Sequence, residues 1–322
     1  YTKNGSTVNL CALDLKKAFD KMNHHGLFIK LMEKMLPNNL LSTLEYWFSI
    51  SVTTVRWGSC FSVFIILKCG IRQGGILSPY LFALFIDDIV KLFVRNNIGC
   101  NVGFACVSIF LYADDIILLA PSVEALQQMI NLCEQQLSSL DMCLNANKSV
   151  CMRFGPRYDC ECCDLTLATG EKLCWVKTCR YLGVYLVAAR QFKCSVDNNK
   201  KSFYRSFNAI FGKVGRAASE EVVVKLLVSK CVPMLTYGLE ACPLSNADKH
   251  SLEFVTTRTF MKVFKTNSVS IVKECQTMFR FRQISEVILH RKRNFLLKYC
   301  KTVNTVCENF SDIARTALIS LN

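Results

Sequence analysis

Residues 107–120, VSIFLYADDIILLA, form the stretch that decides the fold. The segments 108–112 and 116–120 are apolar and indicate two short strands, and the residues between them, Ala113, Asp114 and Asp115, fit a tight hairpin turn. Two adjacent like charges in so apolar a hairpin repel each other, and a divalent cation would remove that repulsion. Without a cation, both carboxylates would simply be turn residues.

A third carboxylate lies near the end of another apolar run. Residues 8–15, VNLCALDL, indicate a buried strand that carries Asp14. Considered alone, Asp14 would be an ordinary strand-end residue. Acidic side chains from neighbouring strands, however, can hold two Mg²⁺ ions, or Mn²⁺, while substrate phosphates complete the coordination. The three carboxylates therefore favour two-metal phosphoryl transfer as the chemistry of this chain.

Composition supports a folded protein with a polyanionic partner. The chain has 322 residues, of which 51% are hydrophobic, so one to three packed lobes are expected rather than bulk disorder. Its net charge of +14 favours a nucleic-acid partner, although charge that serves solubility alone would give the same composition.

The 19 cysteines and the first residues, YTKNG, indicate an intracellular protein. These five residues do not resemble a signal peptide, and the cysteine spacings are not those of small disulfide scaffolds, so reduced thiols are expected. The cluster Cys160, Cys162 and Cys163 lacks a paired C-x-x-C and a nearby His, which makes a zinc site the less favoured alternative. The apolar runs 61–67 and 107–120 are too short or too charged to span a bilayer, so no membrane contact is expected.

The remaining pattern predicts an α+β lobe followed by a helical one, with a boundary near residue 190. Within residues 1–190 we expect helices after the N-cap Asn23 and over 40–50, 80–95 and 122–140, a hairpin over 51–69, and strands over 144–154, 165–173 and 181–186. Residues 191–322 are expected to be helical and basic, with charges at Lys193, Lys200, Lys201, Arg205, Lys213, Arg216, Lys225, Lys230 and 290–293.

The order of the motifs resembles the reverse transcriptases of non-LTR (LINE-type) retrotransposons. Five segments look like polymerase motifs A to E in the family's order, and a sixth is similar to a thumb signature: 12–20 (ALDLKKAFD), 70–79 (GIRQGGILSP), 112–115 (YADD), 144–148 (LNANK), 181–184 (YLGV, the primer grip) and 233–240 (PMLTYGLE). YADD alone would be a weak signal, whereas the ordered set is specific. The resemblance covers roughly residues 8–265.

This resemblance implies both a fold and an activity. The implied fold is an α+β polymerase palm, an antiparallel sheet with helices on one face, followed by a mostly helical thumb that holds nucleic acid. The implied activity is RNA-directed DNA polymerisation, in which two metal ions assist nucleotidyl transfer from dNTPs to a primer 3′-OH, with an RNA template and a DNA primer as partners.

The resemblance also assigns catalytic residues. Asp14, Asp114 and Asp115 are implied to bind the metal ions, with Asp115 contributing mainly electrostatics and a looser contact. The backbone carbonyl next to Asp14, at Leu15, is a further candidate ligand. Lys148 is implied to contact the incoming triphosphate or to protonate the pyrophosphate leaving group. The alternative for Lys148 is an exposed lysine at a strand start.

The implied substrate-binding residues come from motifs A, B and C. Phe19, five residues after the motif A carboxylate, is implied to be a steric gate that excludes a 2′-hydroxyl, and its alternative is a core residue. Gln73 and Gly74 would line the nucleotide and template pocket, where glycine allows close backbone approach. Arg72 would reach a phosphate or remain solvated, and Tyr112 belongs with the substrate-binding residues.

Three other acidic residues are expected to be structural. Asp87 and Asp88 fall within the helix after motif B, and Asp20 is expected to form local hydrogen bonds.

Two alternatives remain at this point. Members of this family carry a fingers region before motif A, and only thirteen residues precede Asp14, so we expect a portion of a larger reading frame. The chain would then be either the polymerase itself or a catalytically incomplete nucleic-acid-binding fragment or relic. A viral RNA-dependent RNA polymerase is less favoured because those enzymes tend to carry Asp where Phe19 stands.

Overall fold

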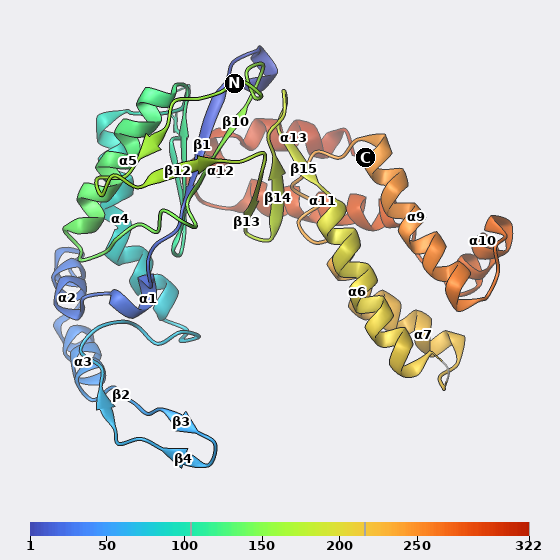
Figure 1. Cartoon of the computed structure of the whole chain (residues 1–322), viewed down its shortest axis with the longest axis horizontal. Helices are drawn as coiled ribbons and strands as arrows, with labels where there is room; N and C mark the ends of the chain where they lie inside the picture. Colours follow the sequence, from blue (N-terminus) through green and yellow to red (C-terminus); the bar gives the residue numbers. More distant parts are fainter. Residues whose placement is uncertain (104, 216, 322) are drawn as a thin grey trace. The chain divides into compact units, whose positions relative to one another are not determined.

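The chain folds into two compact units (Figure 1). The structure, a computed structural model, describes residues 1–103, 105–215 and 217–321, so Arg216 lies outside the described residues. The units are Tyr1–Val176 and Lys177–Asn322. The second unit begins ahead of residue 190 because a three-stranded sheet over residues 178–195 belongs with the helices that follow, and Tyr237 Oη donates a hydrogen bond to the Leu182 carbonyl at 3.1 Å.

A six-stranded sheet forms the centre of the first unit. Its strands are β1 (Val8–Leu13), β8 (Ile109–Tyr112), β9 (Asp115–Ala120), β10 (Val150–Phe154), β11 (Leu165–Thr166) and β12 (Lys172–Trp175). Their order is β11-β12-β10-β1-β9-β8, and all neighbours are antiparallel except β10 and β12. The predicted buried strand β1 is therefore central, with β9 on one side and β10 on the other.

Helices cover this sheet on one face, as expected for the implied fold. The helices of this unit are η1 (Thr2–Asn4), α1 (Ala18–Lys21), α2 (His24–Glu33), α3 (Asn38–Ser49), α4 (Ser78–Asn96) and α5 (Val123–Ser138). Figure 1 shows α4 and α5 together beside the sheet, which both contact. In α4, the buried side chains Leu81, Phe85 and Ile89 recur at helical spacing and so form one apolar face. The predicted N-cap Asn23 is confirmed, because its Oδ1 accepts from His25 N and Gly26 N.

The acidic pair in α4 is structural, which confirms the prediction. Asp87 forms ion pairs with Lys34 at 2.9 Å and Lys91 at 3.0 Å. Asp88 is paired with Lys30 and with Lys91, and these lysines lower the pKa of Asp88 to about 2. The pair therefore ties α4 to the lysines of α2 and the residue that follows it.

Short hairpins complete the first unit. The predicted hairpin over 51–69 is confirmed, since β2 (Val52–Thr53) pairs with β5 (Ile65–Ile66) and β3 (Arg56–Trp57) pairs with β4 (Cys60–Phe61). A further pair is formed by β6 (Asn101–Val102) and β7 (Ala105–Cys106).

The strand predicted over 144–154 is wrong in its first half. The amides of Lys148 and Ser149 both donate to the Asn145 carbonyl, at 3.2 Å and 2.9 Å, and this turn delays the strand to Val150. The run 165–173 turns at Gly170, whose φ is +81°, and forms the hairpin of β11 and β12.

The second unit combines a small sheet with the expected helices. In its sheet, β13 (Thr178–Tyr181), β14 (Val184–Val187) and β15 (Lys193–Ser195) are antiparallel neighbours. Its helices are α6 (Asp197–Val214), α7 (Glu220–Leu226), η2 (Leu227–Cys231), α8 (Val232–Leu235), α9 (Asn246–Val263), α10 (Val269–Met278), α11 (Ile284–Lys301), α12 (Thr305–Asn309) and α13 (Ser311–Ile319). A separate apolar core forms here around Phe203, Leu235 and Phe260. Among the described residues, no helix has both the length and the apolar composition needed to cross a membrane.

Candidate active site

Strand register brings the three predicted carboxylates to one end of the central sheet. In the antiparallel pair of β1 and β9, Leu13 lies opposite Ile116, so the next position places Asp14 beside Asp115. In the hairpin of β8 and β9, Tyr112 pairs with Asp115, and Asp114 lies in the turn after Ala113, whose φ is +53°. Two segments separated by about a hundred residues therefore converge on one cluster of negative charge.

The electrostatics of Asp115 reflect this convergence. Burial raises the pKa of the Asp115 carboxyl, and the negative charges of Asp114 and Asp14 raise it further. Each carboxylate is only partly buried, so the cluster is open to solvent and to ligands. A positive charge bound here would relieve both the desolvation and the like-charge repulsion.

Hydrogen bonds from the segment before β10 hold Asp14. Asn145 Nδ2 donates to Asp14 Oδ2 at 3.1 Å, and the Asn145 amide donates to the Asp14 carbonyl at 2.8 Å. The Asp14 amide in turn donates to Ser149 Oγ at 3.0 Å, and Ser149 is buried. Sequence reasoning missed Asn145 and Ser149 as site residues, although both lie within or beside the motif D segment.

The two residues that flank these contacts differ in exposure. Lys148 Nζ lies 4.0 Å from Asp14 Oδ2, and 71% of the Lys148 side chain is exposed, so the ammonium is free to approach a further anion. Leu15 is buried and forms an isolated bridge with Leu144. The bonds at that bridge use the Asp14 carbonyl and the Lys16 amide, not the Leu15 carbonyl.

The donor chemistry fits a hard divalent cation whose coordination is completed by other ligands. Carboxylate oxygens are the ligands that Mg²⁺ prefers, and such sites commonly use a few carboxylates together with substrate phosphates and water. Within residues 1–103, 105–215 and 217–321, no three His, Cys, Asp or Glu side chains form a cluster that could hold a metal by themselves. The same finding gives no support to a zinc site at Cys160, Cys162 and Cys163.

Phe19 lies between the core and the open site. It belongs to α1, is half-buried, and its ring centroid lies 4.8 Å from that of the fully buried Phe82. The two interpretations of Phe19 are therefore compatible, because one side of the ring can pack on α4 while the remainder stays accessible.

Backbone hydrogen bonds attach the motif B loop to motif A. The Ile71 amide donates to the Phe19 carbonyl at 2.7 Å, and the Gly70 amide donates to the Met22 carbonyl at 2.8 Å. Gly70 has a φ of +83°, and a Cβ there would lie 2.7 Å from the Asp20 carbonyl oxygen. Only glycine fits this close backbone approach without strain.

The other predicted substrate-binding residues are exposed on these loops. Gln73 Nε2 donates to Asp20 Oδ1 at 3.4 Å, so Asp20 does form a hydrogen bond, although its partner is 53 residues away in the chain. Gly74 has a φ of +81° and open space around it. The Arg72 side chain is exposed while its carbonyl accepts from Ser78 Oγ at 2.6 Å, and Tyr112 is 63% exposed at the end of β8.

The second unit contains a cationic groove of about 700 Å³ beside the motif E hairpin. Its lining includes Arg180, Lys201 and Arg205 together with Tyr185 and Tyr237, and none of the described residues that line it is acidic. Charge and aromatic rings on one surface suit a nucleic-acid backbone.

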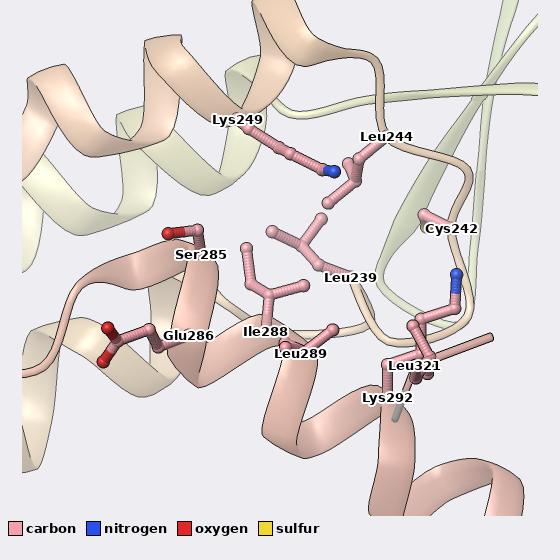
Figure 2. A pocket seen from close by; sticks show the side chains of 10 residues that line it. All are labelled: Leu239, Cys242, Leu244, Lys249, Ser285, Glu286, Ile288, Leu289, Lys292 and Leu321. Atoms are coloured by element: carbon pink, nitrogen blue, oxygen red, sulfur yellow. The ribbon is translucent and has the colours of Figure 1, made fainter. Parts of the chain in front are cut away.

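A smaller cavity of about 310 Å³ in the same unit has a different chemistry (Figure 2). Leu239 and Ile288 lie at its centre, and the charged side chains around it are Lys249, Lys292 and the acidic Glu286. Its mixed charge and apolar floor make it a poor match for a polyanion.

Comparison with known proteins identifies the family. The family model described as reverse transcriptase (RNA-dependent DNA polymerase) matches residues 2–186. The chain belongs to the reverse transcriptase family. Its relatives place it with the non-LTR type, which confirms the resemblance seen in the motifs.

Two relatives show how much of a longer protein the chain spans. It is 24% identical to the RNA-directed DNA polymerase from mobile element jockey of Drosophila funebris, over 71% of this chain and 25% of that protein. It is 27% identical to the Pol polyprotein from type-1 retrotransposable element R2 of Popillia japonica, over 76% of this chain and 35% of that protein. Among solved structures, the chain is similar to telomerase from Candida tropicalis in complex with a TWJ fragment of telomeric RNA. The match covers 100% of this chain and 51% of the telomerase chain, with a TM-score of 0.47 and 12% identity.

Proposed function

We propose that this chain carries the RNA-directed DNA polymerase centre of a retrotransposon protein, with Asp14, Asp114 and Asp115 as the residues that bind divalent metal ions. The observation that carries the proposal is the register that sets Asp14 opposite Asp115, with Asp114 in the adjoining turn. Two Mg²⁺ ions, if held by these carboxylates, would supply Lewis-acid activation of an attacking 3′-oxygen and charge stabilisation for a leaving pyrophosphate.

The chain's own residues supply positioning and charge. Asn145 orients the Asp14 carboxylate through the bond to Oδ2, and the buried Ser149 fixes the backbone of Asp14. The exposed ammonium of Lys148 lies close enough to Asp14 to approach a triphosphate at the same site, where it can balance charge or donate a proton to the leaving group.

The second unit and the names of the relatives support nucleic-acid partners. The jockey relative is described as an RNA-directed DNA polymerase, which supports an RNA template and dNTP substrates here. We assign the groove at Arg180, Lys201 and Arg205 to the phosphate backbone of the template–primer duplex. Contacts of this kind position a duplex without reading its sequence.

A second candidate is a nucleic-acid-binding fragment without polymerase activity. It is favoured by the finding that, among the described residues, no three ligand side chains form a ready-made metal cluster. The two candidates make opposite predictions for catalysis, whereas both predict nucleic-acid binding.

A primer-extension assay separates them. The chain is incubated with an RNA template, a labelled DNA primer, dNTPs and Mg²⁺, and a matched reaction contains EDTA. Incorporation that requires Mg²⁺ supports the polymerase. Binding of the template–primer in a gel-shift assay without any incorporation supports the binding fragment instead.

The contact between Asn145 and Asp14 predicts a dependence on Mg²⁺. Asn145→Ala should lower incorporation about tenfold and raise the half-saturating Mg²⁺ concentration, because residues that orient metal ligands typically contribute 10–100-fold. Asn145→Asp should lower incorporation further than Asn145→Ala does, since the aspartate cannot donate to Asp14 and adds another negative charge. Titration of Mg²⁺ at saturating dNTP checks this. An unchanged Mg²⁺ dependence in both variants would show that Asn145 does not orient the Asp14 carboxylate for metal binding.

The position of Phe19 predicts sugar selectivity. Phe19→Ala should raise the efficiency of rNTP use relative to dNTP use by about tenfold, because a steric clash of one group in a pocket is worth roughly 1–3 kcal/mol. The measurement is kcat/KM for dGTP and rGTP on the same template–primer. Phe82→Leu is the matched control, since it disturbs the core beneath Phe19 without removing the ring at the site. Equal selectivity in wild type and Phe19→Ala would contradict the gate.

A further inference from the structure

A second groove in the C-terminal unit is separate from the one assigned to the duplex. It has a volume of about 490 Å³ and lies between α6 and α9, where its lining includes Tyr204, Phe207 and Asn208 from α6 and Arg258 and Lys262 from α9. The two grooves share no described lining residue. At 100° per residue, Tyr204 and Asn208 lie about 160° and 120° around α6 from Ser202 of the larger groove, and Lys201 stands at the edge between them. The two grooves therefore have distinct linings and adjoin along α6.

The cations of this second groove contact aromatic rings instead of acids. Lys262 Nζ lies 5.2 Å from the Phe211 ring centroid and 5.7 Å from that of Phe207, and it donates to Asn208 Oδ1 at 3.1 Å. The Arg258 guanidinium lies 5.9 Å from the centroid of the Phe254 ring. In the described part of the chain, neither cation forms an ion pair with a carboxylate. Both charges are therefore available to an anion.

The rest of the lining suits a nucleotide. Tyr204 is half-buried, and its ring offers a surface on which a base can stack. The exposed amides of Asn208 and Asn267 can donate to and accept from a base edge or a ribose hydroxyl. None of the described lining residues is acidic. A volume of this size falls within the range of pockets that enclose a small ligand, about 300–1,000 Å³.

We propose that this groove binds a single-stranded segment of RNA, with Arg258 and Lys262 on its phosphates and Tyr204 stacked on a base. A single strand is favoured over a duplex because only unpaired bases expose their faces for stacking. RNA is favoured because the function proposed above supplies an RNA template, and to that extent the inference rests on it. The binding step itself needs neither metal nor dNTPs.

The test is fluorescence anisotropy with the whole chain and a labelled ten-nucleotide oligo(U) in EDTA, so that failure of polymerase activity does not affect the result. The double variant Arg258→Ala/Lys262→Ala should weaken binding tenfold or more and reduce the salt slope by about 1.4, since each phosphate contact with a single strand contributes about 0.7. Tyr204→Leu should weaken binding about tenfold and leave the salt slope unchanged, because it removes stacking and no charge.

The matched control is Lys249→Ala/Lys292→Ala, which removes the same two charges from the cavity of Figure 2 and should change affinity less than twofold. Thermal unfolding of each variant verifies that it folds. Unchanged oligo(U) binding in the Arg258 and Lys262 variant would overturn the proposal. The proposal would also be overturned if the Arg258 and Lys262 variant lost as much affinity for a blunt RNA–DNA duplex as for oligo(U). A third contrary result would be that the wild-type chain binds a DNA oligonucleotide of the same length as tightly as oligo(U).

Discussion

Asp14→Asn should lower the rate of nucleotide incorporation about a thousandfold or more. The variant keeps the shape of the side chain but removes one full negative charge from the cluster formed with Asp114 and Asp115. Metal-assisted stabilisation of developing charge contributes several kcal/mol, and about 4 kcal/mol corresponds to a thousandfold in rate. The loss should appear in kcat, because the change leaves untouched the groove of the second unit that we propose for the template–primer.

The folded state should tolerate this change. The amide oxygen of an asparagine can still accept the hydrogen bond that Asn145 Nδ2 now donates to Asp14. Repulsion around Asp115, whose pKa is raised by burial and then by its acidic neighbours, should decrease. The thermal unfolding temperature in EDTA should therefore not fall. Asp164→Asn, which removes an exposed carboxylate paired with Lys172, is the control for charge alone. Incorporation by Asp14→Asn within tenfold of wild type would contradict the assigned role of Asp14.

The sequence alone identified the separate parts of this site better than their arrangement. Apolar runs predicted the strands that carry Asp14 and Asp115, because both strands are buried and bounded by polar turns. Nothing in the local pattern states that these strands are neighbours, since pairing between segments a hundred residues apart depends on the whole sheet. The resemblance to a known family supplied that adjacency, and the observed register agrees with it.

Residues whose role depends on tertiary contacts could not be identified from the sequence. Asn145 contacts Asp14 only because β10 pairs with the other edge of β1 and the preceding turn reaches past the strand end. The second unit also begins earlier than the predicted boundary near residue 190. Gly183 packs so closely on Tyr237 that a Cβ at Gly183 would lie 2.8 Å from the Tyr237 ring, and this contact joins the short strands to the helices that follow. The sequence of a short strand does not indicate which of two neighbouring lobes the strand packs against.

Gly70→Ala should lower the free energy of unfolding by about 3 kcal/mol and reduce incorporation with it. Two costs combine at this position. An alanine with a φ of +83° is strained by about 1–2 kcal/mol. Its Cβ would also lie 2.7 Å from the Asp20 carbonyl oxygen, a backbone atom that moves only if α1 shifts, and such overpacking typically costs 1–3 kcal/mol.

The shift of α1 links this stability loss to activity. Backbone bonds join Gly70 to Met22 and Ile71 to Phe19, so displacement at Gly70 moves the proposed sugar gate relative to the carboxylates. Gly5→Ala is the matched control, because Gly5 has a similar φ of +79° but nothing within 4 Å of the added Cβ. Urea unfolding should show a loss of about 1 kcal/mol for Gly5→Ala from strain alone. Equal losses in the two variants would mean that the close approach at Asp20 is not what requires glycine at position 70.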